Sequence, residues 1–220
     1  MCGPYIETPY LPQKPVKIAL IDGEIDEGII QQLQEREIKL IKTIKCKELY
    51  RAVQWHPDMV IQPMGGDDIV IAPNVINYYK PILIGLGFNV IEGNTYLKRN
   101  YPDNIAYNIC IVGNYLIHNL KYTDDVILKH CEKNKYLKIH VSQGYSKCSV
   151  AVISDRAIIT SDIGIHKEVQ KFGIDSLFVN PEGIFLSGLN YGFIGGTCGY
   201  LNNKVLAFYG NIKNHKDFKK

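Results

Sequence analysis

A cysteine in a glycine-rich stretch is the residue of this sequence best suited to nucleophilic chemistry. Cys198 lies in the run Gly-Phe-Ile-Gly-Gly-Thr-Cys-Gly-Tyr, which spans residues 192–200. Glycine has no Cβ, so its backbone can turn tightly or let a ligand come close. A thiol presented by such a turn can act as a nucleophile, whereas most free cysteines are small buried residues. The sequence leaves both interpretations open.

Two histidines could move protons to or from such a thiol. His56 opens the segment His-Pro-Asp at residues 56–58, and His118 ends a short apolar run. Histidine titrates near neutral pH and therefore suits a general base. Because a histidine before a proline is also a common structural loop residue, the partner of Cys198 stays open.

Carboxylates and amides at predicted turns and strand ends could bind a cationic or polar substrate. Asp67 and Asp68 follow two glycines and Asp162 follows a predicted strand. At such places aspartate also forms turns or caps a helix, so each position has a structural alternative. The candidates for substrate binding are Asp67, Asp68, Glu92, Asn104, Asn108 and Asp162.

The spacing of the cysteines predicts no metal or redox centre. None of the six cysteines forms a C-x-x-C pair, so zinc-ribbon and thioredoxin-type sites are not indicated, and we expect neither a metal nor a cofactor. Cys110 and Cys148 are expected in buried strands. Because successive side chains of a strand point to opposite faces, Lys147 is not expected to meet the neighbouring Cys148.

Composition narrows the class of protein. The chain has 220 residues, 46% hydrophobic and 21% charged, which is ordinary for a globular protein with a sizeable core. Its net charge of +3 does not indicate a nucleic-acid partner, and the basic run at 213–220 is expected to be a solvated tail. Neither a secretory signal nor an apolar window of membrane-spanning length is visible, so a reducing cytoplasm is the expected location.

A strand–turn–strand–helix–strand pattern repeats along the chain. Each hairpin is predicted from two short apolar runs around a tight turn, and each helix from its apolar face. Complete units are expected at residues 59–91, 109–141 and 150–179, with helices near 76–86, 124–133 and 163–172. This regular spacing is typical of repeat architectures.

Shorter pieces flank these units. A proline-rich, irregular lead-in is expected at residues 1–15, because the spacing of its prolines forbids a helix. The remaining elements are expected as strands at 17–21 and 38–44, helices at 27–37 and 47–55, and a last hairpin whose strands at 193–194 and 205–209 flank the glycine turn. The last unit lacks room for a helix and a closing strand. We therefore expect the first and last pieces to complete one another within one α/β domain spanning residues 1–220.

This ring of repeats, with a Gly-Gly-x-Cys turn in its last unit, resembles the pentein fold, the α/β propeller of the guanidino-group-modifying enzymes. The likeness covers nearly the whole chain from Lys17, and several stretches resemble an uncharacterised branch of that superfamily. These stretches are residues 56–58, 101–108, 143–148, 159–162 and 192–199. The resemblance implies strand-strand-helix-strand pseudo-repeats around a central cavity.

The resemblance also implies a function. In the superfamily's enzymes a cysteine in the last repeat attacks a guanidinium carbon, a histidine shuttles protons, and acidic residues hold the cation. Carried over, Cys198 is the nucleophile of a deiminase-like hydrolase or an amidinotransferase, His56 or His118 is the base, and the partner is a small guanidino-type cation. Ribosome anti-association factors use a similar ring without catalysis, so a non-catalytic binding module or a small-molecule sensor is the alternative.

Overall fold

Three units of the chain repeat one arrangement of strands and a helix. In each unit two strands pair antiparallel as a hairpin, and a third strand pairs parallel with the second. The computed structural model describes residues 6–220, so Cys2 and Pro4 of the lead-in lie outside the described residues. The units are β3 (Ile61–Gly65), β4 (Asp68–Ile71), α2 (Ile76–Gly85) and β5 (Asn89–Glu92); β6 (Cys110–Val112), β7 (Tyr115–His118), α3 (Asp125–Lys133) and β8 (Leu137–His140); and β9 (Val150–Ser154), β10 (Ala157–Thr160), α5 (Ile163–Gln170) and β11 (Asp175–Phe178). The mixed α/β class and the repeats predicted from the sequence are confirmed.

The helix of each unit is the crossover that parallel pairing requires, because two parallel strands cannot be joined by a tight turn. The side chain of Asp124 accepts a hydrogen bond from the Val126 amide and caps α3. The side chain of Asp162 likewise accepts one from the Ile165 amide and caps α5, as its sequence position predicts. Each of these helices buries an i, i+4 pair of apolar side chains against its sheet: Ile127 and Cys131 in α3, Ile165 and Val169 in α5.

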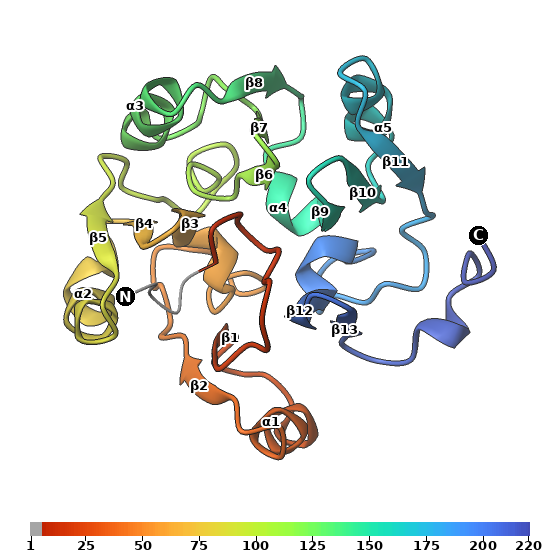
Figure 1. Cartoon of the computed structure of the whole chain (residues 1–220), viewed down its shortest axis with the longest axis horizontal. Coiled ribbons are helices and arrows are strands. Elements are labelled where there is room, and N and C mark those ends of the chain that lie inside the picture. Colours follow the sequence, from red (N-terminus) through yellow and green to blue (C-terminus); the bar gives the residue numbers. More distant parts are fainter. Residues whose placement is uncertain (1–5) are drawn as a thin grey trace.

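The two ends of the chain supply two smaller sheets. β1 (Ile18–Ile21) and β2 (Lys39–Lys42) pair parallel across α1 (Glu27–Gln34), and β12 (Cys198–Asn202) pairs antiparallel with β13 (Val205–Phe208). The amide of Val16, just before β1, donates a hydrogen bond to the Leu201 carbonyl of β12 at 2.8 Å. Figure 1 shows the sheets arranged around the middle of the molecule, with α1, α2, α3 and α5 on the outside.

The core lies where the first strands of the units meet. β6 and β7 are buried throughout, whereas outer strands such as β8 are exposed at most positions. The buried side chains form two clusters, and Tyr10 of the lead-in packs against both. Apart from an isolated bridge between Ile6 and Gly66, residues 6–15 form no helix or strand. Residues 6–15 are therefore irregular in shape, and Tyr10 packs this part of the lead-in against the core.

Three local predictions are wrong. Residues 47–55 form successive turns instead of a helix, with hydrogen bonds that reach back only three residues, as from Val53 to Tyr50. The glycines near Cys198 do not form the hairpin turn: residues 194–197 make a short 3-10 helix, η2 (Ile194–Thr197), and the hairpin turns later, between Asn202 and Val205. Cys148 is buried as expected, but it lies in the short helix α4 (Ser146–Ser149) and not in a strand.

Two further observations complete the fold. Among residues 6–220, no helix has the length and apolar character needed to cross a membrane. The basic tail does not extend freely, because Asp217 accepts a hydrogen bond from the Asn180 amide and Lys216 pairs with Glu182. The tail folds back through the short 3-10 helix η3 (Ile212–Asn214) onto the segment that follows β11.

Candidate functional site

Cys198 is the first residue of β12 and follows η2 directly. It is partly exposed, whereas Cys46, Cys110, Cys131 and Cys148 are buried, so among residues 6–220 it is the cysteine most open to solvent. Burial of its sulfur raises the pKa of the thiol, and the nearby Lys147 ammonium partly offsets this by favouring the thiolate. The position suits a thiol that reacts when a ligand or a base assists it.

Lys147 lies between Cys198 and a cluster formed by His56, Asp58 and Cys148. Its Nζ donates a hydrogen bond to the Gly195 carbonyl at 3.0 Å and lies 5.0 Å from the centroid of the Tyr10 ring. Burial alone would lower the pKa of Lys147, but the neighbouring negative charge, chiefly the Asp58 carboxylate, acts in the opposite direction and the pKa is raised overall. The ammonium therefore stays charged at neutral pH and interacts with both Asp58 and Cys198.

The position of the short helix α4 explains why Lys147 contacts η2. Its backbone packs against η2 so closely that a Cβ on Gly195 would collide with the carbonyl oxygens of Lys147 and Val150. Only glycine permits this approach. The prediction that Lys147 and Cys148 lie on opposite faces of a strand is wrong, because both residues lie in a helical turn. Both of them interact with Asp58.

Asp58, His56 and Cys148 form a tight cluster beside this lysine. The Cys148 thiol donates a hydrogen bond to Oδ2 of Asp58 at 3.2 Å, and one donor atom from each of the three residues lies within 4.8 Å of the others. Burial, and then the Asp58 carboxylate, raise the pKa of Cys148 well above its usual value. Nε2 of His56 lies 3.6 Å from Oδ2 of Asp22, a carboxylate that can orient the ring. Cys148 is therefore held as a neutral thiol, and His56 has a carboxylate partner.

Asn108 fixes the geometry of the cluster. Its Nδ2 donates to the Asp58 carbonyl at 3.1 Å and to the Cys148 sulfur at 3.0 Å, while its Oδ1 accepts from the Cys148 amide at 3.1 Å. One buried amide thus joins two segments that are far apart in the sequence. Of the six residues predicted for substrate binding, Asn108 is the one with recorded contacts to this cluster among residues 6–220.

His118, the other candidate base, lies in a separate buried network. Its Nδ1 is 2.7 Å from the Thr123 hydroxyl and its Nε2 is 2.9 Å from the Gly144 carbonyl. Burial lowers its pKa to about 4, so the ring is neutral at physiological pH. With both nitrogens engaged, the ring connects three segments of the core.

The remaining predicted residues lie apart from the cluster. Asp67 is exposed at the hairpin between β3 and β4, and Asp68 accepts a hydrogen bond from Asn89 and faces His130. Glu92 is exposed at the end of β5, Asn104 is buried and bonded to Arg99 and Tyr145, and Asp162 caps α5 and accepts from Gln143. Their contacts serve turns, loops and a helix cap.

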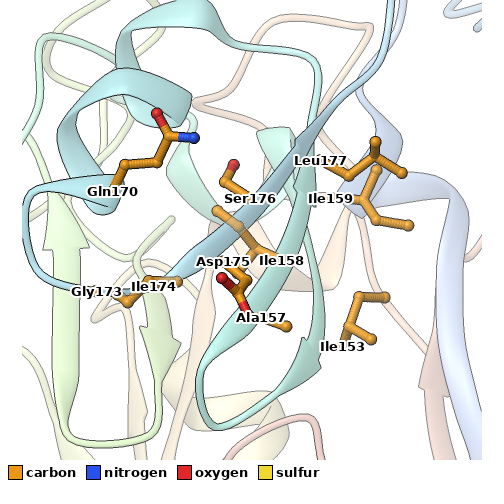
Figure 2. A pocket seen from close by; sticks show the side chains of 10 residues that line it. All are labelled: Ile153, Ala157, Ile158, Ile159, Gln170, Gly173, Ile174, Asp175, Ser176 and Leu177. Atoms are coloured by element: carbon orange, nitrogen blue, oxygen red, sulfur yellow. The ribbon is translucent and has the colours of Figure 1, made fainter. Parts of the chain in front are cut away.

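A hollow on the surface is also separate from these residues. It has a volume of about 610 Å³ and is lined by β9, β10, β11 and the end of α5. Figure 2 shows its mainly aliphatic lining, including Ile153, Ile159 and Leu177. A smaller hollow of about 410 Å³ is lined by Asp68, His130 and their neighbours. Neither hollow includes Cys198, Lys147 or the cluster.

Solved structures identify the class of fold. SxtG, an amidinotransferase from Microseira wollei in the saxitoxin biosynthetic pathway, is similar with a TM-score of 0.56 and 11% sequence identity, covering 91% of this chain and 84% of that chain. C. jejuni agmatine deiminase is similar with a TM-score of 0.53 and 10% identity, covering 98% and 84%. This chain therefore has the pentein fold, as the resemblance in its sequence predicts.

The particular family is also defined. The model of a family described as a family of unknown function (DUF6873) matches residues 20–220, and the chain belongs to that family. A comparison with curated proteins gave no match. The family thus represents a branch of the fold without an assigned activity, which agrees with the resemblance to an uncharacterised branch.

Sequence reasoning did not select Asp58, Lys147, Cys148 or Asp22 as site residues. The sequence His-Pro-Asp at 56–58 could have pointed to Asp58, because a histidine and a carboxylate two residues apart can face one cavity. Lys147 and Cys148 were excluded by assuming a strand where the chain forms a helical turn. Two residues on one helical turn can reach the same surroundings, which two neighbours on a strand cannot.

Proposed function

We propose that this chain is a cysteine-dependent enzyme that acts on a guanidino or amidino group, as a hydrolase or an amidinotransferase. Its units would form a closed propeller in a single domain, with the reaction at the centre. The observation that carries the proposal is the position of Cys198, a partly exposed thiol beside the Lys147 ammonium, which also interacts with Asp58. A thiol, a carboxylate and a histidine are the groups that such chemistry requires.

Each residue has a role in the proposed reaction. The Cys198 sulfur attacks the amidine carbon, so that a C–S bond forms and a C–N bond then breaks as the leaving amine takes up a proton. Water, in a hydrolase, or an acceptor amine, in a transferase, subsequently displaces the sulfur. His56, oriented by Asp22, exchanges the protons, and the Asp58 carboxylate binds the cationic nitrogens.

The proposal assigns the base to His56 because both ring nitrogens of His118 are already engaged. It assigns cation binding to Asp58 because this carboxylate lies in the cluster with His56, whereas the other candidate carboxylates lie apart from it. The side-chain amide of Asn108 positions Asp58 by donating a hydrogen bond to the backbone carbonyl of Asp58. The reaction needs a reduced thiol, which a reducing compartment such as the cytoplasm maintains.

Labelling by 2-chloroacetamidine, a cationic amidine electrophile, tests the proposal. Cys198 should react faster than Cys46, Cys110, Cys131 and Cys148, and its preference for chloroacetamidine over neutral chloroacetamide should fall in Asp58→Asn. Peptide mass spectrometry gives the site and the rate. Turnover on a panel of guanidines, measured as released amine or ammonia, should disappear in Cys198→Ala. Equal labelling of several thiols together with unchanged turnover in Cys198→Ala would overturn the proposal.

A non-catalytic binding module is the second candidate, and one observation favours it. The Lys147 ammonium already lies near Asp58, so a positive charge is present where a guanidinium would bind. A centre neutralised in this way suits a protein that binds a partner or a small molecule without chemistry. Sedimentation of the chain with ribosomal subunits, combined with absent turnover, supports this candidate; turnover that depends on Cys198 excludes it.

A further inference from the structure

Three different metal-binding side chains converge on one point of the centre. His56, Asp58 and Cys148 offer a nitrogen, an oxygen and a sulfur, and these three atoms all lie within 4.8 Å of one another. His56 and Asp58 flank the start of the short 3-10 helix η1 (Pro57–Met59), whereas Cys148 lies in α4. The fold therefore assembles this set from segments that are 90 residues apart in the sequence.

The donor set matches the preferences of zinc-like ions. Imidazole nitrogen, carboxylate oxygen and thiolate sulfur bind Zn²⁺ at bond lengths that place neighbouring ligand atoms about 3.5 Å apart around a tetrahedron. The Cys148 sulfur and Oδ2 of Asp58 are already 3.2 Å apart. Small rotations of side chains would bring the third atom to the same spacing. Three protein ligands leave a fourth position for water or another ligand.

An unpaired oxygen points to a missing partner at this place. Oδ1 of Asp58 is buried and has no hydrogen-bond partner among the described residues. A buried carboxylate oxygen without a donor destabilises the folded state, because it has lost its hydrogen bonds to water and has no replacement in the protein. A cation bound between Asp58, His56 and Cys148 would place a compensating positive charge beside this oxygen.

The surroundings of the three residues resemble a second coordination shell. Nε2 of His56 lies 3.6 Å from a carboxylate oxygen of Asp22, which leaves Nδ1 as the nitrogen for a metal. Carboxylates in this position fix the orientation of a metal-binding imidazole and increase its basicity. Asn108 donates to the Cys148 sulfur and so stabilises a thiolate. The His56 side chain is 23% exposed, which gives an ion a way in.

The positive charge of Lys147 limits the affinity of this site for a divalent cation. Its ammonium interacts with both Asp58 and Cys148, so it already compensates part of the negative charge that a metal would meet. A dication must therefore compete with a fixed positive charge. The site should bind more weakly than a closed structural zinc site, and removal of the lysine charge should strengthen binding.

We propose that His56, Asp58 and Cys148 form a binding site for a zinc-class divalent cation, with an open fourth position. On binding, Cys148 releases its proton to solvent and a metal–sulfur bond forms, while Asp58 and His56 add one oxygen and one nitrogen. The site stands on these three residues and does not depend on the reaction proposed for Cys198. A bound metal would take His56 and Asp58 away from that reaction and thereby inhibit it.

Titration of the metal-free chain with Co²⁺ tests the site directly. The wild type should bind one Co²⁺ per chain, with a thiolate-to-cobalt band in the near ultraviolet and visible bands of tetrahedral geometry. Zn²⁺ should displace the cobalt and raise the midpoint of thermal unfolding. Cys148→Ser should lose the thiolate band and bind at least about ten-fold more weakly, whereas Cys198→Ser, which removes the neighbouring thiol, should keep the band.

Two more variants keep the test decisive if Cys148→Ser folds poorly. His56→Gln, at a partly exposed position, should weaken Co²⁺ binding at least about ten-fold but retain the thiolate band at saturation. Lys147→Met should tighten binding about ten-fold. A thiolate band that survives in Cys148→Ser, one that disappears in Cys198→Ser, or absence of Co²⁺ binding by the folded wild type would overturn the proposal. Because labelling of Cys198 is measured separately, failure of the metal site leaves the proposed reaction to its own test.

Discussion

The buried imidazole of His118 should make the stability of the fold depend on pH. The folded state holds this ring neutral with a pKa of about 4, whereas the unfolded chain takes up a proton near pH 6.5. The stabilisation is therefore complete above about pH 6.5 and is lost as the pH falls toward 4. Between pH 7 and pH 5 this residue alone should cost about 2 kcal/mol of unfolding free energy.

Urea unfolding of the wild type and of His118→Gln at both pH values measures this effect. The variant should be less stable at pH 7, because Thr123 and the Gly144 carbonyl lose their partner, but its stability should change less with pH. NMR of the wild-type ring gives an independent check. An imidazole that titrates near pH 6.5 in the folded protein would contradict the prediction.

At the scale of single residues, the sequence predicted chemical types better than partners. The types and local context of Cys198 and His56 make them candidates; His56 lies in the cluster with Asp58 and Cys148, and Cys198 interacts with Lys147. Asp58 and Cys148 could not be paired in advance, because the hydrogen bond between them joins segments 90 residues apart. Asp67 and Asp162 have side chains suited to cation binding, but their types suit a turn and a helix cap equally well. Only the tertiary contacts distinguish these roles.

Among the elements, η2 depends on a single glycine. A Cβ at position 195 would collide with the backbone oxygens of Lys147 and Val150, whereas a Cβ at position 196 would meet no atom within 4 Å. Gly195→Ala should therefore push η2 away from α4 and destabilise the fold by about 2 kcal/mol. Gly196→Ala, its neighbour, should change stability by less than about 0.5 kcal/mol.

Denaturant midpoints of the two variants provide the comparison. The rate of Cys198 alkylation should also change in Gly195→Ala and not in Gly196→Ala, because Cys198 follows η2 directly. Equal stability of the two variants would show that the contact between η2 and α4 is unimportant.

Elements that depend on local sequence signals were predicted more accurately than elements fixed by contacts between distant parts of the chain. The helices expected near 76–86 and 124–133 match the observed bounds to within one residue, because their apolar faces and the tight turns around them are local signals. The 3-10 helix before Cys198 was missed, because it is fixed by contact with α4, about 50 residues earlier. Residues 47–55 have a helical composition but bury Leu49 and Val53 within turns. Where packing and local preference disagree, packing decides the conformation.

For the whole molecule, Tyr10 should contribute far more to stability than its place in an irregular segment suggests. It packs against both core clusters, donates from its hydroxyl to the Ile109 carbonyl at 3.1 Å and carries the Lys147 ammonium over its ring. Tyr10→Ala should destabilise the fold by about 3 kcal/mol, and Tyr10→Phe by about 1 kcal/mol through the lost hydrogen bonds.

Thermal or urea unfolding tests this order of effects. Tyr96→Ala serves as the control, because that tyrosine is 66% exposed, and it should change stability by less than about 0.5 kcal/mol. If Tyr10→Ala were as stable as the control, the lead-in would not be part of the core. The irregular shape predicted for this segment is observed over residues 6–15, but the sequence did not predict the packing of Tyr10, since prolines reveal local shape and not tertiary contacts.

The hydrogen bond between Val16 and Leu201 also limits the order in which the chain can be assembled. Each hairpin and its crossover helix join residues that leave the ribosome close together in time, so a unit can form while later units are still being made. The contact between the two ends must wait until β12 has been synthesised. A chain that stops before residue 198 would leave the Val16 amide without this partner. Unpaired backbone groups at a strand edge pair readily with other chains, so the nascent protein is protected from this kind of aggregation only after the last hairpin has been synthesised.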